Sequence, residues 1–277
     1  MMTTPDDAQL RASTTYNAAS DHYDDPANTF WSRYGRQTID NLELATGSHV
    51  LDVCSGSGAS AIPAAEAVGL TGSVVGIDLA EHLLRLARTK ANARGLKNIE
   101  FRRGNMLETG FPDSTFDVVV CVFGIFFVPD MASAVTELWR LVRPGGKLAL
   151  TTWGPRFFEP VSTVFWNAIR EVRPDLYKGF NPWDRICDPQ TLRDLFVQGG
   201  AEQVRVHAEP GHHEIPTADA LWAGVMGSGY RGTVDQLSDD DREKVRNSIL
   251  GYIRESGIRH VEANVVYGVA KKPHDPE

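Results

Sequence analysis

Cysteine is scarce in this chain of 277 residues, and long apolar runs are missing. The three cysteines, Cys54, Cys121 and Cys187, are widely separated and contain no C-x-x-C pair, which argues against a disulfide framework and a zinc site. No apolar run approaches the roughly 18 residues of a membrane span, and the polar, acidic N-terminus does not resemble a signal peptide. These absences predict a cytoplasmic protein without a membrane span.

Basic side chains are in deficit: 28 Lys and Arg stand against 36 Asp and Glu, for a net charge of −8. No basic stripe offsets this charge, so nucleic acid is not expected as a partner. Acidic residues near the middle of the chain, Asp113, Asp117 and Asp130, do not form the pattern of a magnesium site. With 42% hydrophobic residues, the chain is long enough for one large domain or for one domain with a lid.

The stretch from Val50 to Ser60, VLDVCSGSGAS, predicts a buried strand, a glycine turn and the start of an alanine-rich helix. Gly56 and Gly58 can adopt backbone angles closed to other residues, and they let a ligand lie against the main chain. Backbone N–H groups and the following helix N-terminus then favour an anionic ligand group, whose identity stays open. The pattern also matches G-x-G-x-x-G/A, so a dinucleotide site stays open here.

Two carboxylates, Asp52 and Asp78, give further support to a ligand-binding turn. Asp52 lies inside the first strand, where an acid is unfavourable unless it braces the loop. Asp78 ends the next apolar run, SVVGID, where a carboxylate can accept hydrogen bonds from both hydroxyls of a ribose. Beyond this point, apolar runs and helical patterns alternate, which predicts a parallel sheet covered by helices on both faces.

LDVCSGSG, GIDLA and LVRPGGKLAL together resemble the class I S-adenosylmethionine-dependent methyltransferases, in particular the ubiquinone/menaquinone-biosynthesis-like branch that modifies small molecules. The resemblance covers residues 16–153 and a final strand near 264–270. It implies a Rossmann-like α/β fold: a seven-stranded, mostly parallel sheet with an antiparallel last strand, helices on both faces and helical lid insertions. It divides the chain into a helical flap (1–48), a cofactor-binding core (49–155) and a lid with closing strands (156–277).

The resemblance also implies which residues meet S-adenosylmethionine. Asn105 stands where relatives often carry an acid near the adenine, and Met106 would lie against the adenine ring. The N-terminal segment with Tyr16 and Tyr23 would cover the methionine end of the cofactor. The expected cofactor-binding residues are Tyr16, Tyr23, Asp52, Cys54, Gly56, Gly58, Asp78, Leu79, Asn105, Met106, Cys121 and Val122.

The methyl acceptor is expected to be a small apolar or aromatic molecule, since aromatic residues replace the histidines that relatives commonly carry after the fourth strand. Runs typical of enzymes that methylate DNA bases or glutamine are absent. The expected acceptor pocket comprises Trp31, Phe123, Phe126, Phe127, Trp153, Trp222 and Tyr230. His212, His213 and Tyr16 are the candidate catalytic residues, although a histidine pair in a polar turn is more often solvated.

Some local expectations can be checked directly against a structure. Residues 1–12 are expected to be disordered or loosely attached, and a helix is expected over 37–44. Two other functions stay open: a nicotinamide-dependent oxidoreductase, opposed by Asp52 and by the Arg-Pro-Gly-Gly turn, and a non-catalytic cofactor-binding protein, because Cys54 replaces the first glycine of the usual triad. The acceptor atom and the choice between monomer and homodimer also stay open.

Overall fold

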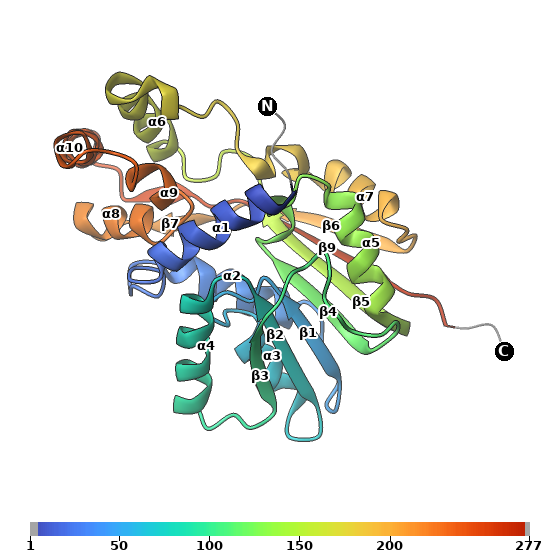
Figure 1. The fold of residues 1–277 in the computed structure, drawn as a ribbon. Helices are drawn as coiled ribbons and strands as arrows, with labels where there is room; N and C mark the ends of the chain where they lie inside the picture. The colour runs from blue at the N-terminus through green and yellow to red at the C-terminus, as the bar shows by residue number, and fades with distance from the viewer. Residues whose placement is uncertain (1–4, 275–277) are drawn as a thin grey trace.

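A computed structural model describes residues 5–274 and contains one seven-stranded sheet, shown in Figure 1. Its strand order is β3-β2-β1-β4-β5-β9-β6. The strands are β1 (His49–Val53), β2 (Ser73–Asp78), β3 (Ile99–Arg103), β4 (Phe116–Val122), β5 (Val142–Trp153), β6 (Val204–Glu209) and β9 (Val265–Lys271).

The central strands run parallel, and β9 alone is inserted in the opposite direction between β5 and β6. β1 pairs with β2 on one side and with β4 on the other, so the carboxyl ends of these strands meet at one edge of the sheet. Open α/β sheets place their ligands at this edge. The expected fold class is therefore confirmed, including the antiparallel last strand.

Helices cover both faces of the sheet because successive strand residues point to opposite faces. Val50 belongs to a core cluster formed with α2, α3 and α4, whereas Leu51 belongs to a second cluster formed with α5 and α7. Both residues are fully buried, as expected for parallel strands between two helical layers. The helices are α2 (Thr29–Asp40), α3 (Ala61–Val68), α4 (Glu81–Ala93), α5 (Met131–Leu141) and α7 (Pro189–Gln198).

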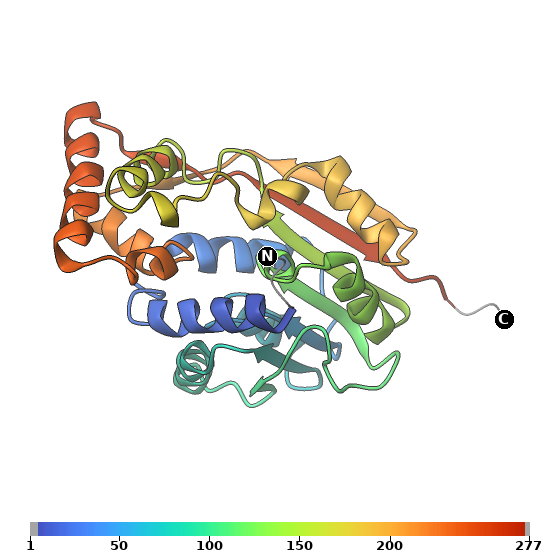
Figure 2. The same ribbon diagram turned by 45° about the horizontal axis from the view of Figure 1, so that its top comes forward.

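A further group of elements lies at one end of the molecule, beyond the carboxyl edge of the sheet (Figures 1 and 2). A separate two-stranded antiparallel sheet pairs β7 (His212–Glu214) with β8 (His260–Glu262) beside these helices. The remaining elements are α6 (Val161–Val172), the 3-10 helices η1 (Ile125–Phe127), η2 (Pro174–Leu176) and η3 (Pro182–Ile186), and the helices α8 (Ala218–Met226), α9 (Arg231–Val234) and α10 (Asp239–Ser256).

Three local predictions are wrong. Within the described range, residues 5–12 are not loosely attached but form the first part of α1 (Pro5–Ala19); residues 1–4 lie outside that range. The helix expected over 37–44 begins earlier, as α2. The histidine pair does not lie in a polar turn: it lies in β7, which pairs with a strand almost fifty residues away along the chain. Each error comes from contacts between distant segments.

No helix within residues 5–274 is long and apolar enough to cross a membrane. Over the same residues there is no group of three or more histidine, cysteine, aspartate or glutamate side chains that could hold a metal ion.

Candidate functional site

The turn after β1 has the backbone geometry of a ligand-binding loop. Cys54 and Gly56 have positive φ values of 58° and 50°. A side chain at Gly56 would be strained by this φ and would approach the Tyr23 hydroxyl to 3.1 Å. Cys54 carries a side chain in the same unusual region, which marks the turn as a place where strain is retained.

Two buried carboxylates hold the turn in place. Asp78 accepts the backbone N–H of Gly56 (2.9 Å) with one oxygen and that of Ala80 (2.8 Å) with the other. Asp52 accepts the Ser60 hydroxyl (2.7 Å) at the start of α3, while its second oxygen has no partner among the described residues. Burial raises the pKa of Asp78, and it raises the pKa of Asp52 to about 7.

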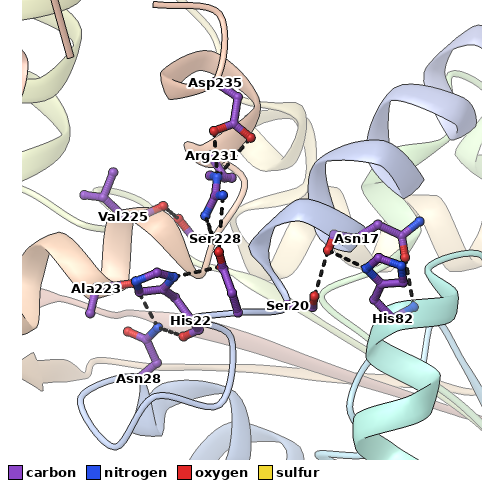
Figure 3. Close-up of polar contacts among 11 residues, drawn as sticks. Asn17, Ser20, His22, Asn28, His82, Ala223, Val225, Ser228, Arg231 and Asp235 are labelled. Atoms are coloured by element: carbon purple, nitrogen blue, oxygen red, sulfur yellow. Dashed lines mark hydrogen bonds and ion pairs between the residues drawn. The ribbon is translucent and has the colours of Figure 1, made fainter. Parts of the chain in front are cut away.

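Helix α1 crosses the carboxyl edge of the sheet and is held there by polar contacts. Gln9 and Asn105 exchange two amide hydrogen bonds (2.8 and 3.1 Å), and Ser13 donates to the Leu79 carbonyl (3.1 Å). The Asn17 side chain accepts the backbone N–H of His82 (2.9 Å), so it caps the start of α4, as Figure 3 shows.

The segment between α1 and α2 is tied to the C-terminal helices in the same way (Figure 3). The Asn28 amide donates to the carbonyls of His22 (2.8 Å) and Ala223 (3.2 Å). Arg231 on α9 binds Asp21 and Asp235. The N-terminal segment thus contacts both the core helix α4 and the inserted helices.

Beneath α1 lies the inner cavity, of about 80 Å³, between α1, the glycine turn and the ends of β2, β3 and β4. Nine of the expected cofactor-binding residues line it: Tyr16, Tyr23, Cys54, Gly56, Asp78, Leu79, Asn105, Met106 and Val122. Phe123, which was assigned to the acceptor pocket, lines it as well.

A second, larger space, the outer cavity, has a volume of about 960 Å³ and lies between α1, η1, η3 and α9. Its wall is strongly aromatic. Five of the expected acceptor-pocket residues line it: Trp31, Phe126, Phe127, Trp153 and Tyr230. Ligand cavities in proteins commonly occupy roughly 300–1,000 Å³, so this space can hold a multi-ring molecule.

The two cavities share one wall. Tyr16, Trp31 and Phe127 line both of them, and the ring of Tyr16 stands edge-on to that of Phe127 at 5.4 Å. Trp31 is stacked on Tyr23 with 5.0 Å between ring centroids. Its indole Nε1 is buried and has no hydrogen-bond partner among residues 5–274. A buried donor without a partner at a cavity wall is a group that a ligand can satisfy.

The inner cavity suits a nucleoside cofactor in its chemistry. It combines a carboxylate that can accept ribose hydroxyls, apolar Leu79 and Met106 beside a flat ring, and aromatic faces that favour a cation such as a sulfonium. Its volume of about 80 Å³ is smaller than that of common ligand cavities. Cofactor loading therefore requires α1 or the aromatic side chains to shift.

Some expected residues lie outside both cavities. Asp52 and Cys121 are buried below the turn, and the pKa of the Cys54 thiol is raised by its hydrogen bond with Cys121 and by burial. Gly58 faces Ile62 and Phe101. Trp222, on α8, lines neither cavity.

The candidate bases are not arranged for proton removal. His212 is exposed and contacts Glu214 at 3.3 Å, while His213 packs edge-on against Phe30, and neither lines a cavity. Burial lowers the pKa of His213. Tyr16 does line both cavities, but burial and the charge of Asp78 raise its pKa, so it retains its proton near neutral pH.

Sequence reasoning missed the residues that α1 contributes. Gln9, Ala12 and Ser13 line the inner cavity, and Arg11 lines the outer one. Lys178 and Trp183, from the segment expected to form a lid or a pocket wall, also line the outer cavity. A polar helix gave no apolar periodicity by which to find these positions.

The strand order, the glycine turn and the Asp78 carboxylate at the edge of the sheet define a class of protein, the class I S-adenosylmethionine-dependent methyltransferases. The model of the ubiE/COQ5 methyltransferase family matches residues 15–177, and the chain belongs to this family. The recognised class and its cofactor are thereby confirmed, and the nicotinamide alternative gains no support.

Curated relatives and a solved structure that are similar to this chain agree with the family assignment. Demethylmenaquinone methyltransferase of Listeria welshimeri is 38% identical over 148 residues, 53% of this chain and 63% of the relative; the match thus spans less than two thirds of its length. The Bacillus cereus enzyme of the same name is 37% identical over 62% of this chain and 77% of its own. A SAM dependent methyltransferase from Aquifex aeolicus has a similar fold, with a TM-score of 0.53, 23% identity, and coverage of 69% of this chain and 89% of its own.

Proposed function

We propose that this chain transfers a methyl group from S-adenosylmethionine, bound in the inner cavity, to a small aromatic acceptor bound in the outer cavity. One observation carries the proposal: Tyr16, Trp31 and Phe127 form a wall common to both cavities. The two cavities therefore adjoin at these side chains, and the shift that cofactor loading requires would bring the acceptor and the methyl donor into contact without solvent between them. The relatives named above are demethylmenaquinone methyltransferases, which supports an electron-rich, quinol-like ring as the acceptor.

In this proposal Asp78 accepts both ribose hydroxyls, while Gly56 lets the cofactor approach the main chain. Asn105 and Met106 lie beside the adenine ring. Bound S-adenosylmethionine supplies an electrophilic methyl group on a sulfonium. Tyr16, Tyr23 and Trp31 surround that end of the cavity with aromatic faces, which favour a cation.

The residues of the outer cavity position the acceptor and exclude water. Trp153 and Phe157 are stacked at 3.8 Å, and Trp183 stands edge-on to Phe157 at 5.6 Å. These side chains form an aromatic part of the cavity wall, called the slot below, against which the acceptor ring is proposed to lie. Among the described residues no histidine lines this cavity, and its tyrosines have raised pKa values because they are buried. Catalysis is therefore assigned to proximity and desolvation, with an acceptor that is already nucleophilic.

Binding and turnover together test the proposal. Calorimetric titration should give binding of S-adenosylhomocysteine but not of NADH or NADPH, and label should pass from methyl-labelled S-adenosylmethionine to 1,4-dihydroxynaphthalene. Trp183→Ala should raise KM for this acceptor about tenfold, because it removes one wall of the slot, and should leave S-adenosylhomocysteine binding unchanged. Tyr177→Ala, an exposed aromatic outside the cavity, is the matched control.

Each failure has a distinct meaning. Binding of NADH in place of the thioether would contradict the cofactor assignment. Thioether binding with no labelled product from a panel of electron-rich aromatics would instead favour a non-catalytic cofactor-binding protein.

A further inference from the structure

The outer cavity has a basic mouth. Arg11 on α1 and Lys178 and Arg185 on the segment between α6 and α7 line it. The two segments are far apart along the chain, yet both contribute cations, together called the basic rim, to the lining of this cavity, and the charge of Arg11 acts on Lys178. None of the three has a carboxylate within ion-pair distance among residues 7–274, the range whose side chains the structure describes, although acidic residues outnumber basic ones in the whole chain.

One carboxylate, Asp235, lies in the lining of the same cavity, where it is paired with Arg231. Arg231 donates from Nε to both of its oxygens, at 2.7 and 2.9 Å. Arg231 also binds Asp21 at 3.0 Å, so this arginine and its two acids form a closed group. One arginine and two carboxylates leave a net charge of −1 in this group, so it offsets only part of the positive charge of Arg11, Lys178 and Arg185.

The pKa of Lys178 reflects its burial and the excess of positive charge around it. Its ammonium lies 5.7 Å from the ring centroid of Trp166, in an aromatic setting that offers no full negative charge. Burial and the nearby charge of Arg11 both lower the pKa of Lys178. An anion between these two cations would relieve their repulsion and raise the pKa of the lysine again.

The rim and the interior differ in character. The interior is apolar and aromatic, with Trp183 edge-on to both Phe126 (5.6 Å) and Phe157 (5.6 Å). We propose that the methyl acceptor is an aromatic molecule carrying an anionic group, a carboxylate or a phosphate, with the ring in the slot and the anion held by Arg11, Lys178 and Arg185. This inference rests on the proposed function, since it describes the acceptor of the same cavity.

Matched probes test the charge directly. With S-adenosylhomocysteine at saturation, calorimetry should compare 1-naphthoate, 1-naphthyl phosphate and the neutral naphthalen-1-ylmethanol. The wild-type protein should bind the anions at least about tenfold more tightly, in keeping with charge-assisted hydrogen bonds. Lys178→Gln and Arg11→Gln should each reduce this preference about threefold to tenfold and leave binding of the neutral probe unchanged.

Lys97→Gln is the control, because Lys97 is exposed in the turn before β3, at the opposite edge of the sheet, and the substitution changes net charge equally. Equal binding of the anionic and neutral probes to the wild-type protein, or no binding of either, would overturn the inference. So would an anion preference that survives in a variant with all three cations replaced.

The competing interpretation is that the basic rim binds a lipid surface, because the apolar side chains of Leu10 and Phe180, which line the same cavity, are 66% and 52% exposed. Sedimentation with phosphatidylglycerol vesicles that is lost in Lys178→Gln, together with no preference for the anionic probes, would assign the rim to a membrane and overturn the inference. Binding of S-adenosylhomocysteine distinguishes failure of the proposed function from failure of this inference. A protein that does not bind the thioether contradicts the proposed function. A protein that binds the thioether but does not prefer the anionic probes contradicts the inference alone.

Discussion

Replacing Asp78 by asparagine should weaken cofactor binding more than the loss of one charge suggests. The two carboxylate oxygens accept two different backbone N–H groups, from Gly56 at 2.9 Å and Ala80 at 2.8 Å. An amide has one acceptor oxygen, so in either orientation its NH₂ group would face one of these donors. The substitution thus disturbs the glycine turn and removes an acceptor for the ribose at the same time.

The magnitude follows from these contacts. A hydrogen bond to a charged group contributes about 1.5–3 kcal/mol, and the variant loses one ribose contact outright and weakens a second. The affinity for S-adenosylhomocysteine should therefore fall by about 2–4 kcal/mol, or about 30- to 1,000-fold in Kd. Because burial raises the pKa of Asp78, wild-type affinity should also decrease toward acid pH, and the variant should lack that dependence.

Calorimetric titration near pH 7.5 measures this change, with thermal unfolding of each protein as a check on folding. Glu81→Gln is the matched control: it removes the same charge three residues away, from an exposed carboxylate paired with Arg88 at 2.6 Å. An asparagine variant that binds the thioether within threefold of the wild-type protein would refute the role given to Asp78.

Two further predictions concern the turn and its support. Because burial raises the pKa of Asp52 from 3.8 to about 7, the folded protein keeps a proton that the unfolded chain loses. The free energy of unfolding should therefore fall by up to roughly 4 kcal/mol as the pH rises from about 4 to above 7. Urea unfolding at pH 5 and pH 8 measures this fall, which should be smaller in Asp52→Asn. An equal fall in the variant and the wild-type protein would contradict the prediction. Cys54 has a φ of 58°, a backbone region that is strained for a β-branched residue and open to glycine. Cys54→Val should therefore destabilise the fold by about 1–3 kcal/mol, whereas Cys54→Gly should be tolerated. Equal midpoints of thermal unfolding for the two variants would contradict this backbone strain.

Local chemistry explains what could be predicted from the sequence. The glycine turn requires positive φ values, and an acid at the end of the second strand is recognisable by its spacing, so Gly56 and Asp78 were found without a structure. The alternation of strands and helices is repeated along the chain, which made the fold class recognisable as well. The roles of these residues toward a cofactor, and the division of the chain into flap, core and lid, stay predictions.

Contacts between distant segments explain what was missed. Helix α1 is held by the polar side chains of Gln9, Ser13 and Asn17, which leave no apolar stripe in the sequence. His212 and His213 belong to a strand whose partner is formed by residues 260–262. The basic rim requires Arg11 to meet Lys178 across more than half of the chain, and no local pattern encodes that meeting.

The shared wall has a thermodynamic consequence. Because Ala12 and Tyr16 on α1 line both cavities, and cofactor loading requires α1 or the aromatic side chains to shift, occupancy of the inner cavity changes a wall of the outer one. Donor and acceptor must then influence each other's affinity by the same factor, since such linkage is reciprocal. The residence time of the spent cofactor is expected to depend on whether the methylated product has already left.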